Sequence, residues 1–322
     1  MLLVTNFERF PGTWRTARGT TGTSIYARTV AEYLEHRENP EAIFVVNCDP
    51  ALTLRLAMRL SAGPKRVLVA VDLVLRIPQG VRAKLLHPLR RYFYGKVDFF
   101  LNYFRDVSGV KLYFGVDEDR SEFVEFKVNL KEFAEGARPD GGYVLCFGRS
   151  LRDYEIFFEA VEQAGYPAAI AKPDWGQMGE HGARWERSTE QLPTNLRLLE
   201  DGGRGEDQIR ILSGARLVVL PILPTSLVGS GISTALNAMA LGKCVIGTKG
   251  PGMNDVFDGG EMLFAPPSDA RALAEVIRRA WDDDALRTLT AEAGWRRAVA
   301  AGGEQDLYQR IVEAIWKRWE TR

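Results

Sequence analysis

Two turns in the sequence have the residue types of an anion-binding site. The segment 148–154 reads GRSLRDY and follows the apolar run YVLCF, and the segment 229–234 reads GSGIST and follows an apolar run at 217–220. Small residues at the start of a helix expose backbone N–H groups and the positive end of the helix dipole to an anion. Arg149 and Arg152 add planar, permanently charged donors that suit a diphosphate.

Each turn also has a purely structural interpretation. A Gly-Ser-Gly turn is often only the start of a helix, Asp153 is a good N-cap, and Arg149 and Arg152 are also explained as solvated loop charges. Position favours binding, because both turns follow strands, and ligands collect at the carboxyl ends of strands in doubly wound sheets. The candidate ligand-binding residues are Gly148, Ser150, Asp153, Gly229, Ser230, Gly231, Ile232, Ser233, Thr234 and Asn237, with Arg149 and Arg152 as candidate catalytic residues.

The elements that must position these turns alternate between strand-like and helix-like segments, which predicts an α/β protein with parallel sheets. Strands are expected at 1–5, 42–47, 66–71, 99–103 and 123–126 in a first set, and at 143–147, 168–171, 196–199, 217–220, 244–247 and 262–264 in a second set. Helices are expected around 23–36, 50–59, 81–93, 273–281, 285–298 and 304–319.

The segment 136–142, rich in Gly, Pro and charge, is typical of a linker between compact units. We therefore expect an N-terminal Rossmann-like domain at 1–138 and a C-terminal Rossmann-like domain at 139–302, with a C-terminal helix at 303–322 that packs back on the first domain. A chain of 322 residues is long enough for two such domains.

Composition excludes several classes of protein. Apolar residues make up 46% of the chain and the formal net charge is zero, which fits a globular protein and does not indicate nucleic-acid binding. No apolar run approaches the roughly 20 residues of a membrane-spanning helix, so a soluble protein is expected. Cys48, Cys146 and Cys244 show no disulfide or metal spacing and are expected to be buried or strand-end thiols in a cytoplasmic protein.

The region from Gly229 to Pro267 resembles the donor-binding signature of the retaining glycosyltransferase family four, the glycosyl transferases group 1, which has the GT-B fold. Residues 237–246 read NAMALGKCVI, similar to the family's Glu-Ala-Met-Ala-x-Gly-x-Pro-Val-Ile helix and strand. Residues 250–260 and the Pro-Pro-x-Asp sequence at 266–269 resemble its following segments, and GRSLRDY resembles a variant of its Gly-Arg loop. The resemblance implies two Rossmann-like domains facing a cleft, with basic loop residues on the donor diphosphate.

The sequence departs from this family at both glutamates of its usual Glu-x7-Glu motif. Gly229 and Asn237 occupy these positions. An amide at Asn237 retains hydrogen-bonding capacity for a ribose hydroxyl, whereas Gly229 leaves no carboxylate for the transferred sugar.

In the N-terminal half, Asp72 is the nearest acidic candidate and a candidate catalytic residue, although a strand-end or turn role is the slightly favoured explanation. The segment 16–26, TARGTTGTSIY, is expected to form a flexible loop at the place of the fold's acceptor loop. Gly22 and Thr23 are candidates to approach the diphosphate there, and a plain surface loop explains them as well. The helix at 81–94 carries five basic side chains beside leucines and is expected to be a solvated face, with peripheral contact to the inner membrane face as a lesser expectation.

The combined prediction is a nucleotide-sugar-dependent, hexosyltransferase-like enzyme of carbohydrate biosynthesis. Its partners would be a nucleotide-sugar donor and a glycan, lipid-linked or small-molecule acceptor, with no nucleic acid and no cofactor. Metal binding is not expected, because His36, His87 and His181 lack ligand spacing and Asp282 to Asp284 suit a helix N-terminus. A non-catalytic scaffolding subunit and a sugar epimerase are the alternatives.

Overall fold

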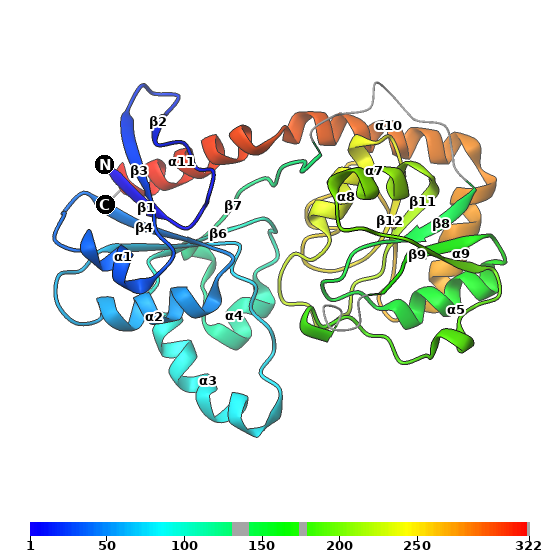
Figure 1. Ribbon diagram of the computed structural model, residues 1–322, viewed down its shortest axis with the longest axis horizontal. Coiled ribbons are helices and arrows are strands. Elements are labelled where there is room, and N and C mark those ends of the chain that lie inside the picture. The colour runs from blue at the N-terminus through cyan, green and yellow to red at the C-terminus, as the bar shows by residue number, and fades with distance from the viewer. Residues whose placement is uncertain (131–141, 174–178, 321–322) are drawn as a thin grey trace. The chain divides into compact units, whose positions relative to one another are not determined.

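The protein forms two compact units in a computed structural model that describes residues 1–130, 142–173 and 179–320 (Figure 1). The N-terminal unit contains Met1–Glu125 together with Gln305–Arg322, and the C-terminal unit contains Phe126–Glu304. The linker predicted at 136–142 and the predicted boundary at 138/139 fall largely or wholly within 131–141, outside the described residues. Within the described residues, no helix has both the length and the apolar character needed to cross a lipid bilayer.

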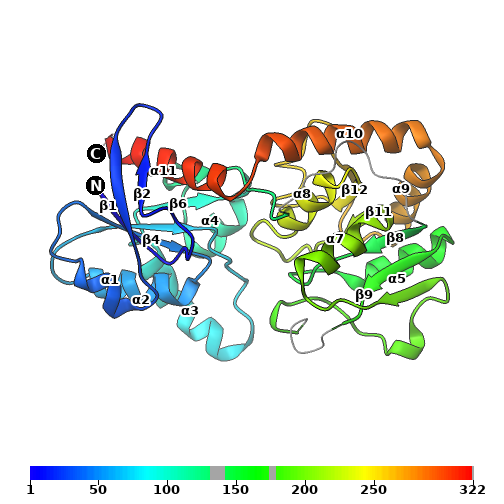
Figure 2. The same cartoon turned by 45° about the horizontal axis from the view of Figure 1, so that its top comes forward.

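The N-terminal unit contains a seven-stranded sheet in the order β2-β3-β1-β4-β5-β6-β7, in which only the β2–β3 pair is antiparallel. Its strands are β1 (Leu2–Thr5), β2 (Thr13–Arg15), β3 (Thr21–Tyr26), β4 (Ala42–Asn47), β5 (Val67–Val71), β6 (Phe99–Asn102) and β7 (Ser121–Phe123). Its helices are α1 (Val30–Glu35), α2 (Pro50–Leu60), α3 (Gly80–Tyr94), α4 (Ser108–Phe114) and α11 (Glu304–Glu320). Helices α1 and α2 lie on one side of the sheet and α11 on the other (Figures 1 and 2).

The C-terminal unit contains a fully parallel six-stranded sheet in the order β10-β9-β8-β11-β12-β13. Its strands are β8 (Tyr143–Cys146), β9 (Ala168–Ala171), β10 (Leu196–Leu199), β11 (Ala215–Leu220), β12 (Cys244–Thr248) and β13 (Leu263–Ala265). Its helices are α5 (Tyr154–Ala164), α7 (Gly205–Ser213), α8 (Ile232–Ala240), α9 (Ala270–Asp282) and α10 (Asp284–Ala301). Renumbered within the unit, this is the 3-2-1-4-5-6 order of the Rossmann fold.

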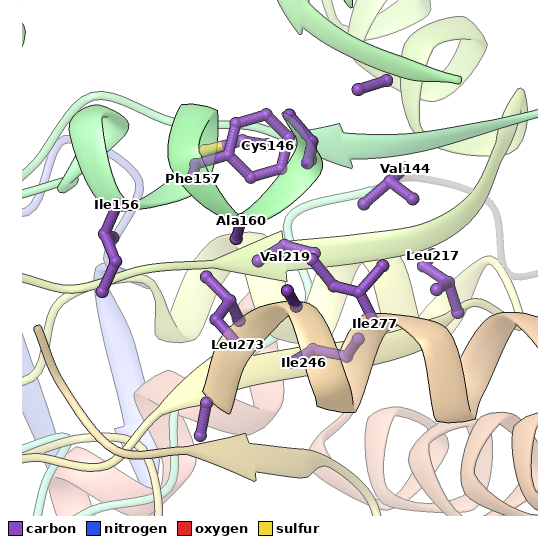
Figure 3. Packing of buried hydrophobic residues seen from close by; sticks show 14 of the residues in the cluster. Val144, Cys146, Ile156, Phe157, Ala160, Leu217, Val219, Ile246, Leu273 and Ile277 are labelled. Carbon is purple, nitrogen blue, oxygen red and sulfur yellow. The ribbon is translucent and has the colours of Figure 1, made fainter. Parts of the chain in front are cut away.

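The core of the C-terminal unit lies between its sheet and the helices α5 and α9 (Figure 3). Leu217 and Val219 point from β11 toward Leu273 and Ile277 of α9, and all four are fully buried. The strands are nearly continuous apolar runs because helices cover both faces of a parallel sheet. This core fixes the strand ends from which the candidate loops emerge.

The predicted α/β fold is confirmed, and so are all six predicted strands of the C-terminal unit, within one or two residues at each end. Asp283 caps α10 by accepting the Leu286 N–H at 2.9 Å, as expected for the acidic triplet. The strand expected at 123–126 is wrong in extent, because pairing with β6 occurs at 121–123 and the chain then leaves the sheet.

The flexible loop expected at 16–26 is also wrong. Residues 21–26 form β3, which pairs with β1 on one side and β2 on the other, and the helix expected from Thr23 begins only at Val30, with Thr29 as its N-cap. Alternating β-branched residues in TGTSI fit a strand, and Gly22 leaves room for the indole of Trp14 on the facing strand.

We predict that Gly22→Ala destabilises the N-terminal unit by about 1 to 3 kcal/mol, because a Cβ at this position would overlap the Trp14 ring. Gly12→Ala is the matched control, since its Cβ would meet no atom within 4 Å. Urea unfolding of both variants beside the wild type measures the difference. Equal effects of the two substitutions would show that Gly22 does not accommodate Trp14.

Candidate functional site

The strand order places a crevice at the carboxyl ends of β8 and β11. The chain runs from β8 outward to β9 and β10, returns to β11 beside β8, and then continues to the other edge of the sheet. Loops that follow the two central strands diverge at such a point and leave room for a ligand. The structure therefore brings together the two turns singled out in the sequence, 148–154 after β8 and 229–234 after β11.

A cavity of about 380 Å³ lies at this edge of the sheet. Gly148, Arg149 and Ser150 line it from the loop after β8, and Thr234 lines it from the first turn of α8. Further lining residues, none of which was predicted to bind a ligand, are Phe147, Tyr154, Ala171, Lys172, Pro173, His181, Asp201, Gly203, Arg204, Gly205 and Gln208. The whole lining thus includes three cationic side chains, those of Arg149, Lys172 and Arg204, which favour an anionic ligand.

Arg149 is the basic side chain that extends from the loop toward this cavity. Its side chain is 42% exposed, and its Nη2 lies 4.0 Å from Oδ2 of Asp201, which follows β10. An ion pair at that distance between partly exposed groups contributes little energy. A bound phosphate would therefore compete well for this guanidinium.

Arg152 is a different kind of residue, because its side chain is completely buried. Its Nε and Nη1 donate to the carbonyl oxygens of Phe147 and Ser150 at 3.0 Å each, and its Nη2 lies 3.4 Å from Oγ1 of Thr234. Burial lowers the pKa of this guanidinium, and no carboxylate of the described residues lies within 4.0 Å of it. Arg152 therefore holds the loop against α8 and does not line the cavity.

Two glycines allow the backbone to approach Arg152 closely. A Cβ at Gly148 would lie 2.6 Å from Arg152 Nη2, and a Cβ at Gly231 would lie 3.2 Å from both terminal nitrogens. Both glycines have left-handed φ values, 101° and 92°. Side chains at these positions would displace the guanidinium or the loop.

Asp153 has the structural role that the sequence left open. Its Oδ1 accepts the Ile156 N–H at 3.3 Å at the start of α5, its Oδ2 lies 3.7 Å from Arg184 Nη1, and it is fully buried away from the cavity. Burial is the largest influence on its carboxyl group and raises the pKa. Tyr154, the next residue, donates a hydrogen bond from its hydroxyl to the Gly148 carbonyl oxygen at 2.6 Å and so holds the loop in place.

The start of α8 has the features of an anion-binding turn. Gly231 occupies the N-cap position in a left-handed conformation, and no side chain caps the first-turn N–H groups. The preceding Ser230 is buried, with its hydroxyl 3.4 Å from that of Ser226. The N–H groups of the turn that begins at Ile232 are thus left for a ligand.

Asn237 lies one turn after Thr234 in α8, but it does not line the cavity. Its Oδ1 accepts the Asn129 backbone N–H at 2.9 Å, its Nδ2 is buried without a hydrogen-bond partner, and only 1% of the residue is exposed. Ser233, one turn earlier, accepts a hydrogen bond from the Asn129 side chain. Neither residue lines the cavity, because Asn129 covers this face of the helix.

Gly229, the other position at which the resemblance expects a glutamate, lies in contact with the loop after β12. A Cβ at Gly252 would overlap Cα of Gly229 and lie 3.0 Å from Ile232 Cδ1. The two backbone segments therefore approach closely only because residue 252 is a glycine, with φ of 79°. Packing explains this part of the glycine-rich loop.

In the N-terminal unit, Asp72 and Cys48 lie side by side at the carboxyl ends of β5 and β4. The Cys48 Sγ donates to Asp72 Oδ2 at 3.4 Å, and both residues have left-handed φ values, 51° and 47°. Burial raises the pKa of the Asp72 carboxyl to about 6, and the thiol hydrogen bond opposes this shift. Cys48 was expected only as a strand-end thiol, and its contact with Asp72 was not foreseen.

Gly22 and Thr23 lie near the start of β3, which runs parallel to β1. They are therefore at the amino edge of the sheet, opposite the carboxyl edge that carries Asp72. The structure does not group these two residues with Asp72.

Several cavity residues that were not predicted could have been located from the sequence, because they follow predicted strands. Lys172 and Pro173 follow β9, and Asp201 to Gly205 follow β10, so the rule that was applied to β8 and β11 also locates them. Tyr154 lies in the segment 148–154 that the sequence did indicate, although no role was predicted for its side chain. His181 carries no such signal, because its approach depends on a folded loop.

Comparison with known proteins identifies the family that the C-terminal unit resembles. Residues 145–283, less than half of the chain, match the family model described as glycosyl transferases group 1. No sequence among curated proteins matches the chain.

Solved structures share the fold over most of the chain. Anabaena Alr3699/HepE in complex with UDP is 13% identical, with a TM-score of 0.68 over 91% of this chain and 85% of that one. The same protein with UDP-glucose gives 13% identity and a TM-score of 0.65 over 98% and 99%. Sucrose-phosphate synthase from Thermosynechococcus elongatus gives 15% identity and a TM-score of 0.66 over 100% and 89%. The chain therefore has the GT-B fold with two Rossmann-like units, and its C-terminal unit carries the region that matches the glycosyl transferases group 1.

Proposed function

We propose that the protein is a glycosyltransferase that takes a sugar from a nucleoside diphosphate sugar bound in the cavity of the C-terminal unit. The observation that carries this proposal is the uncapped start of α8 beside the Gly148 loop at the switch point of a Rossmann sheet. Support comes from the family model over residues 145–283 and from the similarity in fold to one protein, Anabaena Alr3699/HepE, solved with UDP and with UDP-glucose.

The charged groups of the cavity suit a diphosphate leaving group. In the proposal, Arg149 and the first-turn N–H groups of α8 bind the diphosphate and offset the charge that builds up on it as the bond to the sugar breaks. The buried charge of Arg152 acts through Gly148 and Gly231 without direct contact. No metal ion or other cofactor enters this assignment.

The remaining lining residues suit the nucleoside. Lys172 and Pro173 after β9, and Asp201 and Gln208 around the start of α7, extend the cavity away from the start of α8. We assign the nucleoside to this part of the cavity. Neither Asn237 nor Gly229 enters the assignment, because Asn129 and the loop around Gly252 pack against them.

In the N-terminal unit we assign Asp72 to the acceptor. A carboxyl group whose pKa is raised to about 6 is ionised at neutral pH and well matched to accept a proton from an attacking hydroxyl. Retention at the anomeric carbon is the outcome that the resemblance to family four implies.

The proposal leaves the acceptor within three classes, a glycan, a lipid-linked molecule or a small molecule. A cytoplasmic enzyme that uses a lipid-linked acceptor must reach the inner membrane face. Helix α3 has exposed side chains suited to such contact.

We predict that Arg149→Ala weakens binding of the preferred nucleoside diphosphate by about 10- to 100-fold, because it removes a charge-assisted hydrogen bond to phosphate. Calorimetry with UDP, GDP, ADP and TDP and their sugars measures the affinities. Arg271→Ala is the matched control, since this arginine of α9 is exposed and paired with Glu275 away from the cavity.

Both outcomes of this experiment are informative. Binding of one nucleotide series that is lost in Arg149→Ala and kept in Arg271→Ala supports the proposed donor site. If no nucleotide stabilises the wild type at millimolar concentration, the donor site does not exist as proposed, because binding to the folded state must raise its thermal stability.

We also predict that Asp72→Asn raises the rate at which Cys48 reacts with maleimide about fivefold or more near pH 7.5. Cys48 is exposed and so accessible to maleimide. Partial desolvation raises the pKa of its thiol and the charge of Asp72 raises it further, so removal of that charge increases the thiolate fraction. Cys146 and Cys244 are buried and will react slowly. Glu38→Gln is a charge control on the same unit, and an unchanged rate in Asp72→Asn would mean that Asp72 is not ionised beside the thiol.

A further inference from the structure

Helix α3 presents apolar side chains to solvent along its whole length. Val81, Leu85, Leu89 and Tyr92 are 77%, 75%, 52% and 57% exposed. Their spacing of four, four and three residues places them on one face of the helix. Of the fifteen residues of α3, only Tyr94 is buried.

This arrangement reverses the usual amphipathic pattern. A helix that covers a domain normally turns its apolar stripe toward the core and its charged side chains outward. Five of the twelve exposed large hydrophobic residues in the described part of the chain belong to α3, which occupies the lower margin of the N-terminal unit in Figures 1 and 2. Such a concentration marks an interaction surface.

A second exposed leucine region is fixed beside this helix. Arg91 Nη1 donates to the carbonyl oxygens of Leu112 at 2.9 Å and Tyr113 at 3.2 Å, and the His87 ring packs edge-on against Phe114 with centroids 5.2 Å apart. Leu112 itself is 69% exposed. These contacts hold α3 against α4, so the exposed apolar side chains of α3 belong to a helix packed on the N-terminal unit.

The segment that contains α3 carries charge of a single sign. Residues 73–97 contain no aspartate or glutamate and six basic residues, which are Arg76, Arg82, Lys84, Arg90, Arg91 and Lys96. Acidic and basic residues are equal in number in the whole chain, so the rest of the chain carries an excess of acidic residues. An apolar stripe bordered by cations complements a surface that has an apolar interior beneath an anionic outer layer.

We propose that α3 docks the protein on anionic phospholipid bilayers, with the helix lying in the plane of the interface. Val81, Leu85, Leu89 and Tyr92 enter the boundary between headgroups and acyl chains, and Arg82, Lys84 and Arg90 contact the lipid phosphates. A second copy of the chain fits this surface less well, because a symmetric contact through α3 would bring cation against cation. The proposal does not depend on the donor site or on catalysis.

The test is sedimentation of the full chain with vesicles of phosphatidylcholine alone and of phosphatidylcholine mixed with phosphatidylglycerol. The wild type is expected to bind the mixed vesicles, to bind them less at high salt, and to leave phosphatidylcholine vesicles largely unbound. Arg82→Gln combined with Lys84→Gln and Arg90→Gln should weaken binding about 100-fold. Leu85→Gln combined with Leu89→Gln should weaken it at least tenfold.

Leu289→Gln combined with Val299→Gln is the matched control, because these residues of α10 are also exposed, at 66% and 47%. This variant is expected to bind like the wild type. Thermal unfolding of every variant checks that the fold is kept, and exposed positions are expected to leave the midpoint unchanged.

Three results would overturn the proposal. They are the failure of the wild type to bind mixed vesicles, equal binding of the wild type and the α3 variants, and sedimentation equilibrium that shows a dimer lost in Leu85→Gln with Leu89→Gln. The last result would assign α3 to contact between copies of the chain.

Discussion

The candidate site depends on the hydrogen bonds of one buried guanidinium. Arg152 joins the carbonyl oxygens of the loop after β8 to the first turn of α8, so it connects the two strands at which the order of the sheet reverses. Burial of an unpaired charge costs several kcal/mol, which the apolar core under the sheet must offset. The result is a permanent positive charge close to the backbone of Gly148 and Gly231, next to the cavity.

That constraint explains the residues around it. Gly148 and Gly231 must lack side chains because the guanidinium occupies the space that a Cβ would need, and Tyr154 holds the Gly148 carbonyl from the other side. Leu151 takes a left-handed conformation with φ of 52°, which separates an exposed Arg149 from a buried Arg152 only three residues later. Hydrogen bonds from Arg152 and Tyr154 thus hold the loop on both sides where it meets the cavity.

The sequence predicted the architecture well and the site only in outline. Continuous apolar runs such as LVVL are strong signals for buried parallel strands, and the turns after β8 and β11 follow from them. The β2–β3 hairpin was missed because TGTS is polar and its pairing depends on distant partners. The contact of Asn129 with Asn237 spans 108 residues, and no local pattern announces it.

Backbone strain is concentrated at the same edges of the two sheets. Of the four non-glycine residues with left-handed φ in the described part of the chain, Cys48 and Asp72 end adjacent strands of one unit and Leu151 follows the central strand of the other. Each such conformation costs of order 1 kcal/mol and persists only where surrounding structure enforces it. Fully buried strands supply that enforcement here. The packing of each sheet thus offsets the strain at its carboxyl edge and keeps the polar groups there in a fixed arrangement. A preorganised site requires such an arrangement.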